Sequence, residues 1–419
     1  MEKVVDAIQL FDEGKADEAL ELLKNLSEEA NDEQKFAIAE LYDNYGFMDE
    51  GIQLLEELLK TYPDEGQILI KLAEMYIELE QDDLAIHLLN DIKEEDDFYI
   101  QSLIHLADLY QSQGLFEVSE QKLFEAKNLK PDEIIIDFAL GELLFSVGQY
   151  NRAIPFYEKA VKEKEINGVN IIDRLAECNA SLGNYEQALH LYNELQSENT
   201  DTLFKHGLIA KQLNRNDIAI HSWKKLRSID PHYYTVYYEL ANVLKEEGLL
   251  EEAYETVMDG LSYDEFNKEL YLLGAQLSIH LSKKDEGIKY VKQAISLDSD
   301  YKQAILFLIQ LYKEEHLYSE IINVIQSLKK EGSEDPIYDW ELARAYVEEE
   351  MYDAALKAYE DVFLYLGHDS VFLKEYGYFL IEEGQIDKAS SVLTTYMAKE
   401  PLDEETAALL ERLNISNDG

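Results

Sequence analysis

Apolar residues recur at helical spacing in pairs of short segments, each pair separated by a glycine. Leu140 and Leu144 lie on one face of a first predicted helix, and Ile154 and Tyr157 lie on one face of a second. Gly148 stands between them, where a helix can end in the left-handed conformation without a steric penalty. The pattern predicts a helix–turn–helix unit.

The same unit recurs along nearly the whole chain, in steps of 31 to 35 residues that are mostly 34. One position in each first helix is held by Ala7, Ala39, Ala73, Ala107, Gly141, Ala176, Gly207, Ala241, Ala275, Ile309, Ala343 and Gly377. A second position, twelve residues later, is held by Ala19, Gly51, Ala85, Ser119, Ala153, Ala188, Ala219, Ala253, Gly287, Ile321, Ala355 and Ala389. Seven residues after the first position, seven units carry Gly14, Gly46, Gly114, Gly148, Gly183, Gly248 and Gly384.

A helix–turn–helix of 34 residues with small residues at positions 8 and 20 is typical of tetratricopeptide repeat proteins, and the chain resembles the bacterial all-repeat members of that family, with no appended domain. The resemblance implies an all-α fold: a right-handed α-solenoid superhelix of about twelve 34-residue helix–turn–helix repeats plus a C-terminal capping helix. We divide it into acidic N-terminal repeats 1–6 (residues 1–200), repeats 7–12 (residues 201–402), and the capping helix with a short tail (residues 403–419).

Two regions depart from the regular pattern. Repeat 10 carries Ile309 and Ile321 at both small positions, which predicts looser packing of its two helices. The spacing is irregular between residues 163 and 201, and we expect a bend or offset of the solenoid there.

The chain is strongly acidic, with a net charge of −50 over 419 residues. The charge is concentrated at one end, because residues 1–100 hold 29 Asp and Glu against 7 Lys. This charge disfavours direct binding to nucleic acid or to an anionic membrane, and it favours a basic partner. The single cysteine and the absence of a secretory or membrane-spanning pattern lead us to expect a cytoplasmic protein that is not inserted into a membrane.

The resemblance implies that the first helices line a concave groove, partly through positions 5 and 9 of each repeat. In repeats 2–6, position 9 is acidic throughout, with Glu40, Glu74, Asp108, Glu142 and Glu177. Position 5 in repeats 2–5 is apolar, with Phe36, Ile70, Ile104 and Phe138. An acidic row beside an apolar row suits a peptide rich in Lys or Arg and apolar residues, although an incidentally acidic solvated face gives the same pattern.

A second candidate groove lies in the later repeats, where the same columns are polar and aromatic. Its residues are Tyr238, Asn242, Gln276, Gln310, Trp340 and Arg344. Two of these have a simpler interpretation, since Trp340 fits a core position and Arg344 fits an ion pair with a neighbouring glutamate.

No pattern in the sequence indicates catalysis or a cofactor. There is no glycine-rich phosphate loop, no HExxH motif and no close His/Cys cluster, and Cys178 has no residue arranged to activate it. We therefore expect no enzyme, no metal and no cofactor. The leading hypothesis is an intracellular scaffold or adaptor that binds a basic, partly apolar peptide or protein surface in the groove of repeats 2–6. The alternative is an acidic decoy that occupies the nucleic-acid-binding surface of a basic partner. The sequence leaves the oligomeric state open.

Overall fold

The computed structural model describes residues 2–417, which form two compact units that divide between Asn214 and Arg215. The first unit contains α1 (Glu2–Asp12), α2 (Ala16–Glu29), α3 (Asp32–Asn44), α4 (Met48–Thr61), α5 (Gly66–Glu78), α6 (Asp82–Asp91), α7 (Tyr99–Ser112), α8 (Phe116–Leu129), α9 (Ile134–Ser146), α10 (Tyr150–Ala160), β1 (Glu165–Ile166), β2 (Val169–Asn170), α11 (Ile171–Ser181), α12 (Tyr185–Leu195) and α13 (Thr200–Gln212). The second contains α14 (Asn216–Ile229), α15 (Thr235–Glu246), α16 (Leu250–Tyr263), α17 (Lys268–His280), α18 (Lys284–Leu297), α19 (Lys302–Glu314), α20 (Tyr318–Lys330), α21 (Pro336–Glu348), α22 (Tyr352–Leu366), α23 (Ser370–Glu382), α24 (Ile386–Met397) and α25 (Glu404–Asn417).

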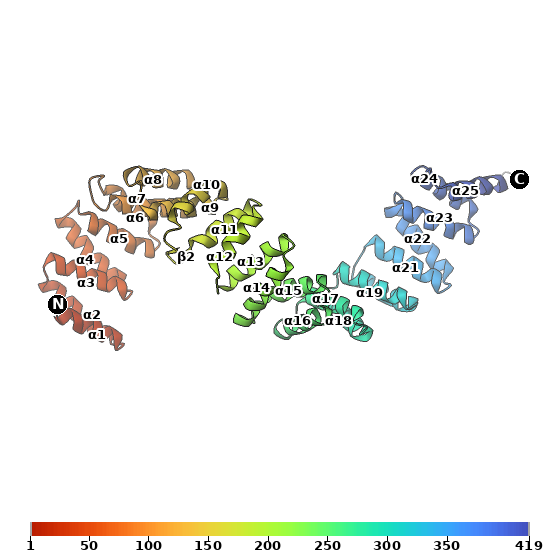
Figure 1. Ribbon diagram of the computed structural model, residues 1–419, viewed down its shortest axis with the longest axis horizontal. Coiled ribbons are helices and arrows are strands. Elements are labelled where there is room, and N and C mark those ends of the chain that lie inside the picture. The colour runs from red at the N-terminus through yellow and green to blue at the C-terminus, as the bar shows by residue number, and fades with distance from the viewer. Residues whose placement is uncertain (1, 418–419) are drawn as a thin grey trace. The chain divides into compact units, whose positions relative to one another are not determined.

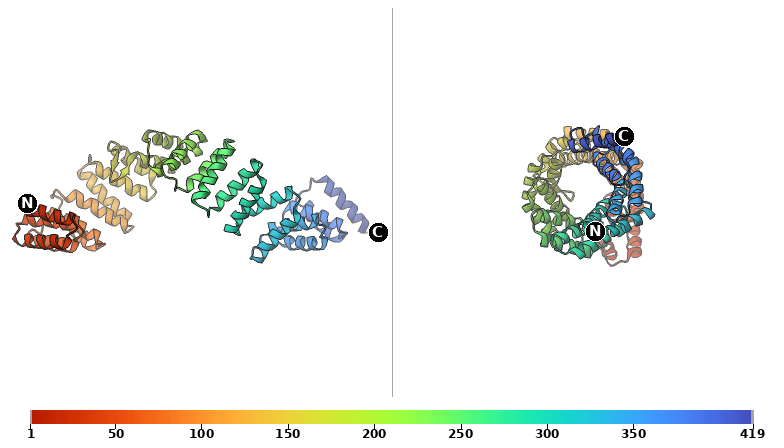
Figure 2. Two further views of the ribbon diagram at one scale, coloured as in Figure 1. Left: turned by 90° about the horizontal axis from the view of Figure 1, so that it is seen from below. Right: turned by 90° about the vertical axis from the view of Figure 1, so that its right-hand side faces the viewer.

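Within each unit, consecutive helices pack in pairs and each pair packs on the next (Figure 1, Figure 2). The small positions explain this packing, because all twenty-four of them are buried. A side chain added at Gly141 would place its Cβ 2.7 Å from Cε1 of Tyr157, so only glycine allows the first helix of repeat 5 to approach the second. The all-α solenoid of helical pairs that the repeat pattern predicts is confirmed.

Every repeat also turns through a residue with positive φ at position 15. The seven predicted glycines have φ between 69° and 80°. The other five repeats adopt the same conformation at Glu80, Asn214, Ser282, His316 and Glu350, with φ between 54° and 61°. The turn geometry therefore belongs to the repeat and not to glycine alone.

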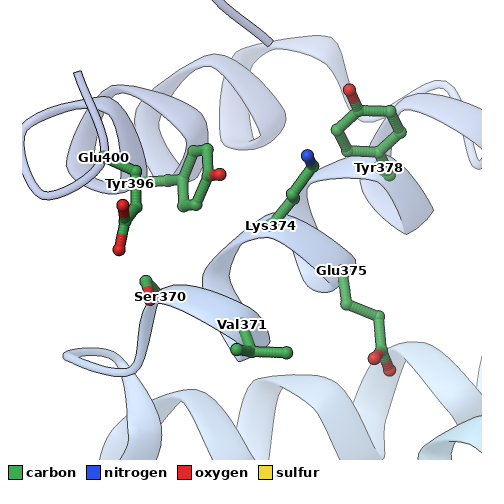
Figure 3. Close-up of a pocket in the computed structure, with 7 residues that line it drawn as sticks. All are labelled: Ser370, Val371, Lys374, Glu375, Tyr378, Tyr396 and Glu400. Atoms are coloured by element: carbon green, nitrogen blue, oxygen red, sulfur yellow. The ribbon is translucent and has the colours of Figure 1, made fainter. Parts of the chain in front are cut away.

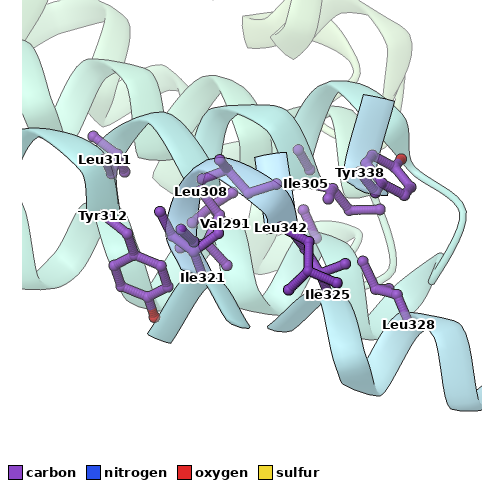
Figure 4. Close-up of a cluster of buried hydrophobic side chains, with 14 of the residues drawn as sticks. Val291, Ile305, Leu308, Leu311, Tyr312, Ile321, Ile325, Leu328, Tyr338 and Leu342 are labelled. Atoms are coloured by element: carbon purple, nitrogen blue, oxygen red, sulfur yellow. The ribbon is translucent and has the colours of Figure 1, made fainter. Parts of the chain in front are cut away.

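Repeat 10 shows the effect of larger residues at the small positions. Ile309 and Ile321 are buried in a cluster to which helices α17, α18, α19, α20 and α21 all contribute (Figure 4). The backbones of α19 and α20 pack less closely than those of the helix pairs in repeats 9 and 11, because isoleucine occupies the space that alanine or glycine leaves free there. The two backbones are therefore farther apart, as expected, whereas the side chains fill the space between them.

The irregular spacing after α10 is a two-stranded hairpin. β1 and β2 pair antiparallel through Glu165 with Asn170 and Ile166 with Val169. Asn167 and Gly168 form the turn with φ of 50° and 77°, as a type I′ hairpin requires. The hairpin replaces a last helical turn, and its apolar side chains pack on the core of repeats 5 and 6.

Candidate functional site

The apolar residues at position 5 divide into two kinds. Ile70 and Phe138 are buried and belong to the core, with exposed fractions of 4% and 6%. Phe36 and Ile104 are half-buried and present part of their side chains to solvent. Only the second pair is available to contact a ligand without a rearrangement of the core.

Two of the five position-9 carboxylates are held by a single arginine of the same unit. The guanidinium of Arg174 donates from Nε to Oε1 of Glu142 at 2.9 Å and from Nη2 to Oε2 of Glu142 at 3.2 Å. Its Nη1 donates to Oε2 of Glu177 at 2.9 Å, and Lys205 also donates to Glu177. Arg174 lies over the ring of Phe145, with 4.6 Å between Cζ and the ring centroid. The charges of Glu142 and Glu177 are therefore largely neutralised within the chain.

Glu74 also has partners on its own face. It lies 3.5 Å from Nζ of Lys71 and 3.4 Å from Nε2 of His105, and it accepts a hydrogen bond from Gln101 at 3.2 Å. Lys71 makes a closer pair with Asp43, at 2.5 Å between Nζ and Oδ2. These contacts lower the pKa of Glu74, chiefly through the bond to His105.

Glu40 and Asp108 differ from the other three carboxylates. Both are exposed, and within the described part of the chain neither has an ion pair or a side-chain hydrogen bond. Desolvation by the surrounding protein raises the pKa of Asp108, and the neighbouring His105 only partly offsets this effect. Asp108 is thus a carboxylate without a direct ion-pair partner among the described residues, and its desolvation is only partly offset.

Three of the position-9 carboxylates contact a basic residue at position 6 of the next repeat. These contacts join Glu74 with His105, Glu142 with Arg174 and Glu177 with Lys205. Glu40 does not follow this pattern, because Lys71 at that position pairs with Asp43 and Glu74 instead. For Asp108 the residue at that position is Ala139, so no partner is supplied.

The second candidate groove is also used internally. Asn242 donates to the carbonyl oxygen of Tyr238 at 3.0 Å, Gln276 accepts from Lys245 at 3.1 Å, and Gln310 donates to Glu314 at 3.0 Å. These polar groups therefore have partners in the chain itself.

Trp340 and Arg344 meet at one carboxylate, that of Glu375. Trp340 Nε1 and Tyr359 Oη each donate to Oε1 of Glu375 at 2.8 Å. Arg344 donates from Nε to the same Oε1 at 2.8 Å and from Nη2 to Oε2 at 2.5 Å, and it pairs with Glu341 at 2.9 Å. Desolvation raises the pKa of Glu375, but the bonds and charge of Arg344 outweigh it, so the pKa lies below its ordinary value.

A pocket of about 540 Å³ lies between α23 and α24 in repeat 12 (Figure 3). It is lined by Ser370, Val371, Lys374, Glu375, Tyr378, Tyr396 and Glu400. Lys374 extends between the rings of Tyr378 and Tyr396, with its Nζ 5.9 and 5.8 Å from their centroids. The same Nζ lies 2.7 Å from Oδ2 of Asp403.

A second pocket, of about 340 Å³, occupies the same place in repeat 2, where α3, α4 and α5 meet. It is lined by Asp32, Glu33, Phe36, Leu58, Tyr62, Glu65, Gln67 and Ile68. Tyr62 donates from its hydroxyl to Oδ2 of Asp32 at 2.8 Å. Sequence reasoning missed both pockets, since it examined positions 5 and 9, whereas these pockets form at positions 1, 2, 5, 27 and 31.

The described residues contain no cluster of three or more His, Cys, Asp or Glu side chains arranged to hold a metal ion. Cys178 is buried, and burial raises the pKa of its thiol to about 12. Among the helices of residues 2–417, none is both long enough and apolar enough to cross a bilayer.

Comparisons with known proteins agree with the repeat architecture. Models described as "YpiA-like, tetratricopeptide repeats" and "YpiA-like, C-terminal tetratricopeptide repeats" match residues 111–165 and 336–403, and a general tetratricopeptide repeat model matches residues 46–109. Human DnaJ homolog subfamily C member 3 is 22% identical over 52% of this chain and 47% of its own. A solved structure, described as "YrrB: a TPR protein with an unusual peptide-binding site", aligns with a TM-score of 0.39 and 17% identity over 43% of this chain and 95% of that one.

One relative matches along the full length. The "TPR repeat-containing protein YpiA" of Bacillus subtilis (strain 168) is 38% identical over 413 residues, which are 98% of this chain and 98% of the relative. The protein belongs to the YpiA-like family of tetratricopeptide repeat proteins.

Proposed function

We propose that this protein is a scaffold that binds a basic, partly apolar peptide segment of another protein on the first-helix face of repeats 2–6. Tetratricopeptide repeat proteins generally mediate protein–protein interaction, which supports the class of function. The observation that carries the choice of face is Asp108, a carboxylate that has no ion pair among the described residues and whose position-6 counterpart is Ala139.

The neighbours of Asp108 supply the rest of the proposed surface. Ile104 lies one helical turn earlier on α7 and is half-exposed, so an aliphatic side chain can pack beside the carboxylate. Glu40 offers a second unpaired carboxylate two repeats away. The paired residues Glu74, Glu142 and Glu177 line the same column but contribute less, because a ligand would have to displace their partners.

The magnitude of the effect follows from the exposure of these carboxylates. An exposed ion pair contributes about 0.2–1 kcal/mol, so Glu40 and Asp108 together favour binding by about two- to thirtyfold. Apolar contacts then supply most of the affinity, and the carboxylates supply selectivity and association rate.

The test uses peptides selected from a random dodecapeptide library against the wild-type protein. The selected peptides should be enriched in Lys or Arg together with aliphatic residues. Their affinity should fall about tenfold in the double variant Glu40→Gln with Asp108→Asn, measured by fluorescence anisotropy in 150 mM NaCl. In the variant Ala139→Arg, the new guanidinium can pair with Asp108 as Arg174 pairs with Glu142, and we expect a loss in affinity although every carboxylate is retained.

A matched control removes two charges elsewhere in the same unit. Glu117 and Glu186 are exposed in the first turns of α8 and α12, so Glu117→Gln with Glu186→Gln should change the affinity less than twofold. Peptides without basic residues, or equal losses in both double variants, would contradict the proposed face. Equal losses with binding abolished at 0.5 M NaCl would instead support the alternative of an acidic decoy, which the net charge of −50 favours.

A further inference from the structure

The chain places its own lysine against a carboxylate at the end of three repeats in the second unit. In each case the lysine stands at position 1 or 5 and the carboxylate at position 31 or 34 of the same repeat. The pairs are Lys268 with Asp298 at 2.5 Å, Lys302 with Asp335 at 2.5 Å and Lys374 with Asp403 at 2.7 Å. This end of the repeat is thus a place that accommodates an ammonium group.

Aromatic rings complete two of these lysine sites. The ring centroid of Tyr301 lies 5.0 Å from Nζ of Lys268, and Tyr396 lies 5.8 Å from Nζ of Lys374. A cation over a ring face gains electrostatic attraction in addition to its carboxylate bond.

Repeat 2 has the acceptor groups of such a site without the lysine. Carboxylates stand at positions 1, 2 and 34 as Asp32, Glu33 and Glu65, and Tyr62 stands at position 31. Among the residues that line the pocket there is no Lys, Arg or His, and Glu33 and Glu65 have no ion pair in the described part of the chain. Position 5, which is Lys374 in repeat 12, is Phe36 here.

The helix ends around the pocket do not cancel this negative charge. The N-termini of α3 and α5 contribute about +0.5 of a charge each, and the C-terminus of α4 contributes about −0.5. Three carboxylates outweigh this sum several times, so the side chains that line the pocket carry a net negative charge. Its floor is apolar, because Leu58 and Ile68 are buried there and Phe36 is half-buried.

We propose that the pocket of repeat 2 is a subsite for one lysine or arginine side chain of a bound partner. The aliphatic stem packs on Phe36, Leu58 and Ile68, and the charged head lies among Glu33, Glu65 and the ring of Tyr62. The inference rests on the proposed function, since it assumes a basic segment on this part of the chain, and it extends the contact surface to the N-terminal end of repeat 2.

The test places a local probe in the pocket. Tyr62 is replaced by 3-fluorotyrosine, and its ¹⁹F resonance is followed while Nα-acetyl-lysine N-methylamide is titrated in 150 mM NaCl. A saturable shift is expected with this probe and with the arginine analogue. The norleucine analogue, which has the stem without the charge, should cause less than a third of the shift. A second label at Tyr352, which is exposed in the other unit, reports non-specific effects.

Two variants test the cause of the shift. Glu33→Gln with Glu65→Gln should abolish it, whereas Glu117→Gln with Glu186→Gln should leave it unchanged. Phe36→Lys would supply the lysine that repeat 12 contains, and it should also abolish the response.

Each remaining outcome overturns the inference. These outcomes are no saturable shift, an equal shift with norleucine, an equal shift at Tyr352, or a shift that survives the loss of Glu33 and Glu65. The peptide experiment at Asp108 is scored separately, so a lysine response at Tyr62 without an effect at Asp108 would refute the proposed face and retain the pocket. The reverse result would refute the pocket alone.

Discussion

Glu350 holds a left-handed turn that glycine holds in seven other repeats, and its replacement by glycine should stabilise the protein. Its φ is 58°, against 69° for Gly384 at the same position of the next repeat. The left-handed conformation costs a residue with a Cβ about 1–2 kcal/mol. Glycine loses about 0.5–1 kcal/mol through the greater freedom of its unfolded state. The midpoints of these two ranges give an expected net gain of about 0.75 kcal/mol.

The surrounding contacts do not change with this substitution. The turn is closed by backbone bonds from Glu350 N to Val347 O at 3.0 Å and from Met351 N to Tyr346 O at 2.8 Å, and glycine retains both. The side chain of Glu350 is exposed and has no hydrogen bond or ion pair among the described residues, so nothing else is lost. The gain is therefore assigned to backbone strain alone.

Urea unfolding followed by far-UV circular dichroism measures the effect. Glu350→Gly should raise the midpoint of the transition that reports the second unit without changing its slope. Glu350→Ala keeps the Cβ and should give no gain. Glu349→Gly, at a residue with φ of −90°, should lower the midpoint. An unchanged midpoint for Glu350→Gly, or an equal rise for Glu350→Ala, would refute the assignment to left-handed strain.

Three further predictions concern groups inside the units. Gly141→Ala should destabilise the first unit by about 1–3 kcal/mol, because the new Cβ would lie 2.7 Å from the ring of Tyr157; thermal unfolding checks this, and an unchanged melting temperature would contradict it. Glu375→Gln should lower the unfolding free energy at pH 7 by about 1–3 kcal/mol, because Arg344 and two neutral donors lose a charged acceptor. The pKa of Glu375 is lowered in the folded state, so its contribution to the unfolding free energy is present above the unfolded pKa of about 4.3 and is lost as the pH falls through the folded pKa. A difference in unfolding free energy between wild type and variant that stays constant down to pH 2 would contradict the assignment. Cys178, with a pKa of about 12, should resist iodoacetamide at pH 8 and react rapidly in urea, and equal rates in both conditions would show that the thiol is accessible in the native state.

The repeat register made the fold predictable from the sequence. Small residues at positions 8 and 20 fix where helices touch, and the structure buries each of them. The turn at position 15 could be predicted from residue type in seven repeats, because glycine is present there. In the others, as at Glu80 or His316, only the register indicates the left-handed residue. The hairpin was not predicted, although the sequence contains a local signal for it, because Asn167 and Gly168 are the residue pair that type I′ turns favour.

The candidate site was less predictable, because ion pairs depend on residues about thirty positions apart. The acidic row predicts negative charge on one face, but the charge of Glu142 is neutralised by an ion pair with Arg174, 32 residues later. No local pattern contains that information. The pockets at the repeat ends were not predicted for a related reason, since they combine the first positions of a repeat with its last positions, as Asp32 and Glu65 do in repeat 2.

Ion pairs between position 9 of one repeat and position 6 of the next help to separate structural from binding charges in an acidic solenoid. Such pairs occur in both units with opposite polarity, as Glu142 with Arg174 in the first and Arg344 with Glu375 in the second. Because they occur with either sign, these pairs contribute to the stacking of neighbouring repeats, and their charges are not free for a partner. Asp108 stands opposite Ala139 and lacks this structural role. Its desolvation is only partly offset by His105, and we propose that a cation from the partner offsets the rest.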